Sequence, residues 1–530
     1  MRSTFHGLET SKRALFTQST ALNTMGHNIA NAATEGYSRQ RVNMAAGRPL
    51  AFPGLQRENT PGQLGTGVVY TSITRVRDNY LDLQFRRENQ QLGMWDVHDQ
   101  ALKAIEKIIN EPSKSGLSSV MDKFWNSLEV LNRDPQLLSA RIDFIGSATN
   151  MANTLHHMDT SLDTLQADAE RNIEIKLGQA NSLINNIAQL NDTIRKTERM
   201  GDHANDYRDQ RDLLLDQLSG IVDMQYTEDP NGMVSVYVSG NQVVNGITAT
   251  PLEQGSVAAI TSGEIAGYKK AIDEVNKTRN QLNGLIDTLV NGKVDITLPN
   301  GYTTNIDRVA KNDVEVEDAS GNKQTITAGN TIPAGTTITS SVTFEVNGFN
   351  GVHELGYTME KPSGTGLPFF TTTDGSGTFN ISNIQVNPEI AADTNKIAAS
   401  GKYELDTNGN MVTIRGNGDI AHALAGLRDK TFTYPSGQTS LSEGTTDDFF
   451  RAMVSELGTS ANNATRNYTN QMNLVDGVNF RRSAVSGVDT NEEIADMIRF
   501  QHAYNAAARN MTAIDEMLDR IINQMGVVGR

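Results

Sequence analysis

Nine histidines are the residues of this chain best suited to bind a metal ion, but their arrangement does not favour a metal site. His156 and His157 are adjacent, so on a helix their side chains point in different directions, and the sequence contains no HExxH pair. The 530 residues include no cysteine, which excludes disulfides, thiolate metal ligands and cysteine nucleophiles. We therefore predict neither a metal site nor a cofactor.

Glycine-rich and aspartate-rich segments resemble ligand-binding loops in composition only. GQLGTGVV (62–69) and GSGTF (375–379) lack the features of a nucleotide loop, and DPNGM and DTNGNM lack the sixth-position glycine and closing glutamate of a calcium loop. The 62 acidic residues give close carboxylate pairs by chance, and no serine lies in a GxSxG elbow. These segments are typical of turns and hairpins, so we predict no catalytic residue and no enzyme.

The segment NDYRDQRDLLLDQLS (205–219) has a different pattern of charge. Arg208, Asp209, Arg211 and Asp212 alternate in sign and precede a run of leucines. One interpretation is a charged helical face, on which each i,i+3 or i,i+4 pair contributes only a few tenths of a kcal/mol. The other is an interface, and the sequence leaves both open.

Composition limits the classes of partner and the location. The formal net charge is −16 and the pI is about 5.1, so nucleic acid is not an expected partner. No apolar run is long enough for a cleavable secretory signal or a membrane span, so we expect neither. The length predicts two to four domains, because a single core stops growing before 530 residues.

Both ends of the chain carry apolar residues at seven-residue spacing, which is typical of coiled-coil helices. The N-terminal helix is predicted over 4–29 and is followed by Gly36, and the C-terminal helix begins near Asp489, which can cap it. These narrow seams suit pairing of the two ends and then contact with further copies. The predicted subunit-interface residues are Leu8, Leu15, Leu22, Met25, Ile29, Met497, Phe500, Tyr504, Met511, Ile514, Leu518 and Ile521.

The middle of the chain alternates between helical and strand patterns. Residues 97–223 hold helical spacing, with Gly146, Gly178 and Gly201 predicted to mark turns. MQYTEDPNGMVSVYVSGNQVVNG (224–246) alternates apolar and polar residues around turn residues, which predicts a hairpin. Residues 293–345 are rich in Thr and Val and predict an inserted β segment, and 366–440 carry further short strands.

Several motifs resemble known flagellar proteins. ALNTMGHNIANAATEGYSRQRV (21–42) and the segment 486–523 are similar to the terminal motifs of flagellar rod, hook and hook-associated axial proteins. PGQLGTGVVYTSITRVRDNYLDLQFR (61–86), the 205–219 segment and the hairpin resemble the FlgK family of hook-associated proteins, and the likeness covers most of the chain except 293–345. The residues that carry these motifs are Asn28, Asn31, Gly36, Tyr37, Ser38, Arg208, Asp209, Arg211 and Asp212.

The resemblance implies a structural protein that joins the hook to the filament and thereby serves motility. It implies passage through the flagellar type III export channel from the cytoplasm, an extracellular location and assembly as a helical ring of copies. The implied partners are further copies of the chain, the hook protein, the second junction protein, filament subunits and an export chaperone. The chaperone would bind the C-terminal helix through Met497, Phe500, Tyr504, Met511, Ile514 and Leu518.

Together, the helix and strand patterns and the resemblance to the FlgK family predict an α+β multidomain fold. Residues 1–45 and 488–530 form a coiled-coil-like inner domain that is disordered in the free monomer. Residues 46–292 and 346–487 form a mainly helical domain with a hairpin and short strands, and 293–345 form an inserted all-β outer domain.

Three alternative functions are compatible with the sequence. A hook or rod subunit has similar termini, but those proteins are mostly β between them. A surface-displayed adhesin or enzyme carried by 293–345 would keep a ligand or activity in that segment alone. A cytoplasmic coiled-coil scaffold is the third, and it would not leave the cell.

Overall fold

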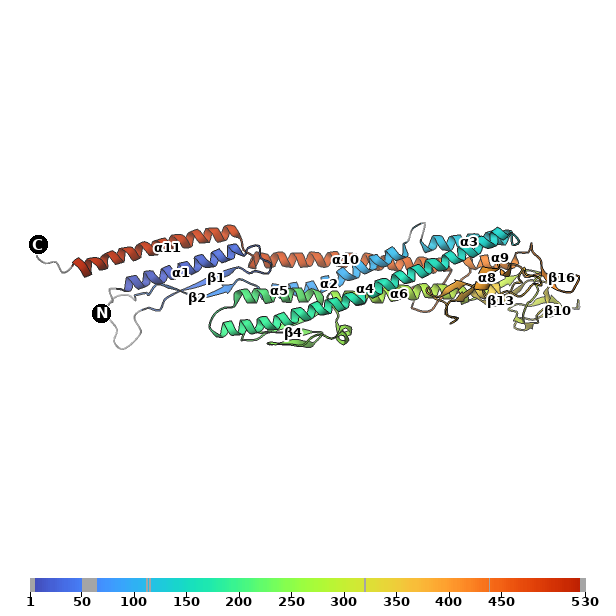
Figure 1. Ribbon diagram of the computed structural model, residues 1–530, viewed down its shortest axis with the longest axis horizontal. Coiled ribbons are helices and arrows are strands. Elements are labelled where there is room, and N and C mark those ends of the chain that lie inside the picture. The colour runs from blue at the N-terminus through green and yellow to red at the C-terminus, as the bar shows by residue number, and fades with distance from the viewer. Residues whose placement is uncertain are drawn as a thin grey trace. The chain divides into compact units, whose positions relative to one another are not determined.

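The computed structural model describes residues 5–49, 64–110, 113, 116–318, 321–437 and 439–524 (Figure 1). Residues 1–4 and 525–530 of the predicted inner domain, and 61–63 of the motif 61–86, lie outside the described residues. The chain forms two compact units, each assembled from separate stretches of sequence. Unit 1 consists of Met1–Asp96, Ile173–Gly267 and Asn467–Arg530, and unit 2 of Val97–Asn172 and Tyr268–Arg466.

Helices make up most of the secondary structure. The longer ones are α1 (His6–Ala30), α2 (Asn79–Ile109), α3 (Leu117–Arg133), α4 (Leu138–Arg199), α5 (Asn205–Ile221), α6 (Glu264–Asn291), α10 (Thr446–Ser486) and α11 (Thr490–Asp519). The shorter ones are α7 (Gly348–His353), α8 (Pro388–Ala392) and α9 (Asp419–Ala425). Within the described residues, no helix is both long and apolar enough to cross a membrane.

α4 is one continuous helix, although turns were predicted within its span. Gly201 has a φ of +95° and lies in the turn after α4, as predicted, but Gly146 and Gly178 lie inside the helix. Each interior glycine costs about 1 kcal/mol relative to alanine. Burial of apolar side chains along α4, such as Leu155 and Ile187, outweighs that cost.

The strands of unit 1 form two antiparallel sheets. β1 (Gln40–Ala46) pairs with β2 (Val68–Arg75), with a bulge between Asn43 and Met44. The predicted hairpin is confirmed and extended into a sheet of β3 (Met224–Glu228), β4 (Val234–Val238), β5 (Asn241–Asn245) and β6 (Thr248–Ala249). Its β3–β4 turn contains Gly232, which has a φ of +76° that glycine adopts without a Cβ clash.

The predicted β segment does form strands in unit 2. β7 (Lys293–Leu298) pairs antiparallel with β13 (Val342–Asn347), so the first and last strands of the segment close on each other. Between them lie β8 (Arg308–Val309), β9 (Val314–Glu317), β10 (Lys323–Ile326), β11 (Thr331–Ile332) and β12 (Thr337–Ile338). The buried side chains of the whole segment, including Ile296 in β7 and Phe344 in β13, belong to the same core as those of α3 and α4. A separate all-β outer domain is therefore not confirmed, and the three-domain layout stays a prediction.

The rest of unit 2 packs aromatic side chains around α3. The remaining strands are β14 (Phe370–Thr372), β15 (Ile384–Val386), β16 (Tyr403–Leu405), β17 (Met411–Thr413), β18 (Phe432–Thr433) and β19 (Glu443–Gly444). Phe124 is fully buried, and its ring centroid lies 5.7 Å from that of Phe144, 5.6 Å from that of Phe349 and 6.2 Å from that of Phe370. Helices, strands and loops of unit 2 thus share one core.

His353, at the end of α7, is completely buried in this core. Its Nδ1 lies within hydrogen-bonding distance of the Leu367 carbonyl oxygen, and its Nε2 lies 2.9 Å from the backbone nitrogen of Ala398. The neutral imidazole satisfies both contacts by donating from Nδ1 and accepting at Nε2. Burial, together with the nearby Arg141, lowers the pKa of His353 to about 4, although the hydrogen bond to the Leu367 carbonyl opposes the shift.

We expect unit 2 to lose stability as the pH falls from 6.5 to 4. In that window the unfolded chain binds a proton at His353 and the folded chain does not, so acid favours unfolding. The loss approaches about 3 kcal/mol at the acidic end. Hydrogen exchange of the α7 and β14 amides at pH 7.5 and 4.5 measures it. His353→Gln should flatten this pH dependence, and an unchanged slope would contradict the assignment.

Candidate assembly interface

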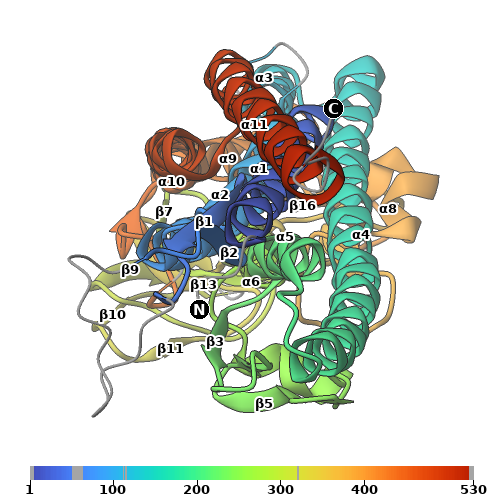
Figure 2. The same ribbon diagram turned by 90° about the vertical axis from the view of Figure 1, so that its left-hand side faces the viewer.

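The terminal helices α1 and α11 lie side by side in unit 1 (Figure 1 and Figure 2). Asn510 Nδ2 donates to Ser11 Oγ at 2.9 Å. A Cβ added at Gly7 would lie 2.9 Å from Ile514 Cδ1, so the absence of a side chain at Gly7 permits this close approach. The two ends of the sequence are therefore paired within one chain.

Some of the predicted interface residues are buried between α1 and α11, and others are exposed to solvent. Met25 and Leu518 are buried, whereas Tyr504 and Ile521 are exposed. The half-buried residues are Leu8, Leu15, Leu22, Ile29, Met497, Phe500, Met511 and Ile514. Further exposed apolar residues on these helices or next to their ends, which the seven-residue series do not include, are Phe5, Phe16, Ile494, Ile498, Met517 and Ile522. The i,i+4 spacing of Ile494 and Ile498 was the available sequence signal for a second apolar face.

Glu493 fixes the start of α11 to the segment that follows α1. Its side chain is fully buried, with Oε1 2.6 Å from Arg39 Nε, and its Oε2 accepts from Asn28 Nδ2 at 2.9 Å. Arg39 also pairs with Glu492 at 3.1 Å. Asp489 caps α11 as predicted, because its side chain accepts from the backbone nitrogens of Asn491 and Glu492.

Asn28, a predicted motif residue, has every hydrogen-bonding position of its amide occupied. Its Nδ2 donates to the Gln40 carbonyl at 2.9 Å and to Glu493, and its Oδ1 accepts from Tyr37 Oη at 2.8 Å and from the Gln40 backbone nitrogen at 3.0 Å. Burial raises the pKa of Tyr37, as do the nearby carboxylates Asp206, Asp209 and Glu493, so the phenol stays protonated and donates.

The other predicted motif residues after α1 shape the turn into β1. Asn31 ends the helix and its Nδ2 donates back to the His27 carbonyl at 3.0 Å. Gly36 has a φ of +79°, as predicted, and a Cβ there would lie 3.0 Å from Leu213 Cβ. The Ser38 backbone nitrogen donates to Asp209 Oδ2 at 2.8 Å. This turn therefore rests directly on α5.

Glu493→Gln should loosen the first turns of α11. The substitution keeps the size of the side chain but removes its charge opposite Arg39, at a cost of about 2 kcal/mol. Faster hydrogen exchange of the amides of residues 493–500 in assembled flagella would report this loosening. Glu492→Gln is the matched control, because the Glu492 side chain is 59% exposed and its replacement should have little effect. Equal effects of the two changes would contradict a role for Glu493 as the anchor.

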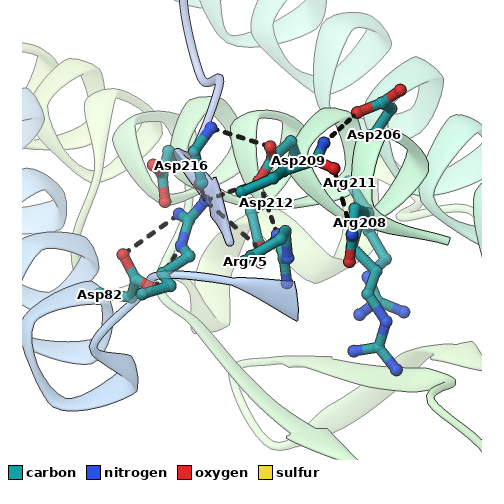
Figure 3. A network of polar contacts seen from close by, with 12 residues as sticks. Arg75, Asp82, Asp206, Arg208, Asp209, Arg211, Asp212 and Asp216 are labelled. Carbon is teal, nitrogen blue, oxygen red and sulfur yellow. Dashed lines mark hydrogen bonds and ion pairs between the residues drawn. The ribbon is translucent and has the colours of Figure 1, made fainter. Parts of the chain in front are cut away.

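Behind this turn, α5 carries aspartates into a buried network of ion pairs (Figure 3). We define the Arg–Asp network by Arg75, Arg77, Arg86, Arg482, Asp82, Asp209, Asp212 and Asp216. The arginines come from the end of β2 and the residues after it, from α2 and from α10, and the aspartates come from α2 and α5. The formal charges within this set sum to zero.

Asp212 lies at the centre of the Arg–Asp network. Its Oδ2 accepts from Arg75 Nη1 at 2.8 Å and lies 3.5 Å from Arg77 Nη1, and its Oδ1 accepts from Arg86 Nη2 at 3.1 Å. Asp216 accepts from Arg86 Nε at 2.6 Å and from Arg482 Nη2 at 2.7 Å. Each of these carboxylates therefore joins separate elements of unit 1.

Asp82 and Asp209 complete the network at its edges. Asp82 pairs with Arg77 Nε at 2.6 Å and with Arg482 Nε at 3.0 Å. Asp209 Oδ1 accepts from Arg75 Nη1 at 2.7 Å, while its Oδ2 accepts from the turn at Ser38. The network thus links α2, α5, β2 and α10 to the turn that positions α11.

The pKa shifts follow from burial and from these partners. Burial would raise the pKa of Asp212, but Arg77, Arg86 and Arg75 together outweigh it and hold the pKa below its ordinary value. Burial raises the pKa of Asp209 despite Arg75 and the Ser38 donors. For Arg77 and Arg86, burial favours the neutral form, but the surrounding carboxylates raise the pKa above the ordinary value.

Arg208 and Arg211 point from α5 toward the hairpin sheet. Arg208 Nε donates to Glu198 at 2.6 Å and its Nη1 donates to Glu228 at 2.6 Å. Arg211 is buried, and its Nη1 donates to the Gly232 carbonyl at 2.6 Å and to Asn191 Oδ1 at 3.0 Å. The alternating charges of 205–219 thus bind other elements of unit 1 rather than their own helix.

The polar residues of this region are therefore arranged to hold elements together. Among the described residues, no group of three or more His, Asp or Glu side chains is placed to hold a metal ion. The arrangement consists of a fixed base, formed by the Arg–Asp network and Glu493, and a helix pair with apolar side chains on its outer faces. Surfaces of this kind are suited to contact between proteins.

Comparison with known families agrees with this arrangement. The family described as "Flagella basal body rod protein" matches residues 8–37, and "Flagellar basal body rod FlgEFG protein C-terminal" matches residues 482–525. The matches at its two ends thus define the chain as a flagellar axial protein. Residues 102–370 match the "Flagellar hook-associated protein FlgK helical domain". The chain belongs to the family of flagellar hook-associated protein 1, FlgK.

Individual relatives support the same family. Flagellar hook-associated protein 1 of Bacillus subtilis is 32% identical over 545 residues, which cover 100% of both chains. The protein of that name in Salmonella typhimurium is 25% identical, covering 95% of this chain and 97% of the relative. The solved structure of the flagellar hook junction protein FlgK from Burkholderia pseudomallei aligns with a TM-score of 0.50 at 13% identity. It covers 77% of this chain and 100% of that one, and at this identity it supports the fold alone.

Proposed function

We propose that this chain is a structural protein that joins the hook to the filament of the bacterial flagellum by polymerising through its terminal helices. The observation that carries the proposal is the α1–α11 pair, which is anchored at its base and exposes Ile494 and Ile498 on α11. Burying each such side chain against a neighbour contributes roughly 1.5–3 kcal/mol. The partners are further copies in a helical ring, the hook protein, the second junction protein and filament subunits.

The route to that location is part of the proposal. The chain leaves the cytoplasm through the flagellar type III channel and works outside the cell. Its terminal helices are disordered in the free monomer and become ordered when neighbours cover them. Complete absence of cysteine means that no disulfide has to be reduced before passage.

Before export, a chaperone binds α11 through the residues predicted from the resemblance, Met497, Phe500, Tyr504, Met511, Ile514 and Leu518. Most of these residues are at least half-buried where α11 packs against α1. The same apolar face cannot contact α1 and a chaperone groove at once. Chaperone binding and pairing of the terminal helices are therefore alternatives in this proposal.

Deleting residues 490–530 tests the proposal. We expect filaments to detach and chaperone binding to disappear, while hydrogen exchange in unit 2 stays unchanged. A second variant, Ile494→Ser with Ile498→Ser, keeps Glu493 and should also weaken attachment. The control carries Gln501→Ala and Asn505→Ala, at exposed polar positions of the same helix, and should support normal filaments. Normal filaments on the deletion variant would refute the interface.

A further inference from the structure

An exposed aromatic side chain with a cation beside it lies on the outward face of α1. Phe16 is 61% exposed, and the Lys12 side chain is 54% exposed. Lys12 Nζ lies 6.0 Å from the centroid of the Phe16 ring, so the two side chains share one surface. We define the α1 knob by Lys12 and Phe16.

The surroundings of the α1 knob carry a positive charge. Glu9 Oε2 lies 4.0 Å from Lys12 Nζ, and Glu9 Oε1 lies 3.2 Å from Arg13 Nε. One carboxylate is therefore shared by two cations, in a chain whose net charge is −16. A partner that suits the knob is apolar and concave, to take the ring, and carries carboxylates, to face the ammonium group.

A groove with those properties lies between the start of α1 and the last turns of α11. We call it the tip groove, and its volume is about 550 Å³. Its lining residues are Phe5, Leu8, Asp515, Glu516, Leu518, Asp519, Arg520, Ile522 and Asn523. Asp515 and Glu516 form no ion pair with another residue of the described chain. The tip groove is thus concave, partly apolar and acidic.

The α1 knob cannot enter the tip groove of its own copy. Phe16 lies about 12 Å along α1 from Leu8, the nearer of the two α1 residues that line the groove. It also points away from α11. Ser11 faces α11, where it accepts from Asn510, and Phe16 follows Ser11 by about 140° of helical rotation. A contact between the knob and the groove therefore requires two copies.

We propose that the tip groove of one copy receives the α1 knob of a second copy. The Phe16 ring packs against Phe5 and Ile522 of that groove, and Lys12 faces Asp515 and Glu516, so opposite charges flank an apolar centre. Each copy carries one knob and one groove on different surfaces, and such head-to-tail contacts repeat into helical assemblies. This inference rests on the proposed polymerisation and names surfaces that produce it.

Photocrosslinking in flagella tests the contact. Phe16→p-benzoylphenylalanine keeps an aromatic ring at the knob and links it to whatever the ring touches on illumination. Flagella that contain the full chain with this change should give covalent dimers, and mass spectrometry should find the links at the residues that line the tip groove. Asn23→p-benzoylphenylalanine is the matched control, because Asn23 is exposed on the same side of α1 two turns farther along. It should give no link to the groove.

An exchange of charges supplies the second measurement and leaves every aromatic side chain in place. Lys12→Glu should lower the amount of the chain retained on isolated flagella by about tenfold, because like charges then meet across the contact. Adding Glu516→Lys to the same chain should restore retention. Lys323→Glu makes the same change of charge at an exposed position of unit 2 and should have no effect. This measurement decides the question where the photoreactive chain does not assemble.

The contact and the proposed polymerisation can fail separately. Links outside the tip groove, links to another protein, or no dimers in flagella that contain the photoreactive chain overturn the contact and leave polymerisation intact. Full retention of the Lys12→Glu chain has the same meaning, as does a loss that Glu516→Lys does not reverse. Absence of the unsubstituted chain from flagella overturns both.

Discussion

Asp212→Asn lowers the free energy of opening α5 by about 3–5 kcal/mol. The substitution keeps the shape of the side chain but leaves Arg75, Arg77 and Arg86 around a neutral group in a buried site. An unpaired buried charge costs more than the pair contributed, so the loss is large for a single atom exchange. Native-state hydrogen exchange of the α5 amides measures it locally, which suits a chain of two units.

The pH dependence of this effect has a defined sign. The pKa of Asp212 is lower in the folded chain, so its contribution is complete above the unfolded pKa and disappears as the pH falls through the folded pKa. The difference between the native chain and Asp212→Asn should therefore shrink below about pH 4. The contribution of Asp209 to stability changes with pH in the opposite direction, because its pKa is raised in the folded chain. Asp202→Asn, at an exposed position of the preceding turn, should change little at any pH, and an equal effect there would contradict the network.

Phe124→Ala destabilises unit 2 by about 3–5 kcal/mol. Phe124 is fully buried, and its removal leaves a cavity among rings that are fixed by helices, strands and loops. Neighbouring side chains from several elements cannot all move inward, so most of the cavity persists. Hydrogen exchange of the α3 and β7 amides reports the loss.

Phe480→Ala is the matched control for Phe124→Ala. Phe480 is 77% exposed, so the same chemical change should alter stability by less than about 0.5 kcal/mol. Comparable destabilisation by both substitutions would show that Phe480 is buried in solution and would contradict its exposure near the end of α10.

The local features of the fold were predictable from the sequence. Seven-residue spacing predicts a helix over 4–29, and α1 occupies His6–Ala30. Asp489 predicts the start of α11, and alternation with turn residues predicts the hairpin of β3 and β4. Each of these signals involves residues close together in the sequence. Periodicity and capping chemistry are sufficient at that range.

The long-range features were not predictable in this way. Glu493 contacts Asn28, 465 positions away in the sequence, and Arg482 reaches Asp216 across 266 positions. No local pattern distinguishes these residues from other charged residues on a helix. The turns predicted at Gly146 and Gly178 were wrong for a related reason, since burial against distant elements decides whether a helix continues through a glycine.

The burial of the Arg–Asp network determines how this molecule responds to salinity. Dissolved ions screen exposed charges over a Debye length of about 8 Å at physiological ionic strength, but they screen buried pairs much less. Passing from fresh water to brine should therefore leave the base of α11 intact. Arg39 and Glu492 form a pair at the edge of this base, and the Glu492 side chain is 59% exposed, so brine should weaken their attraction. Strong salt would therefore weaken the exposed pairs of unit 1 while its buried network stays intact.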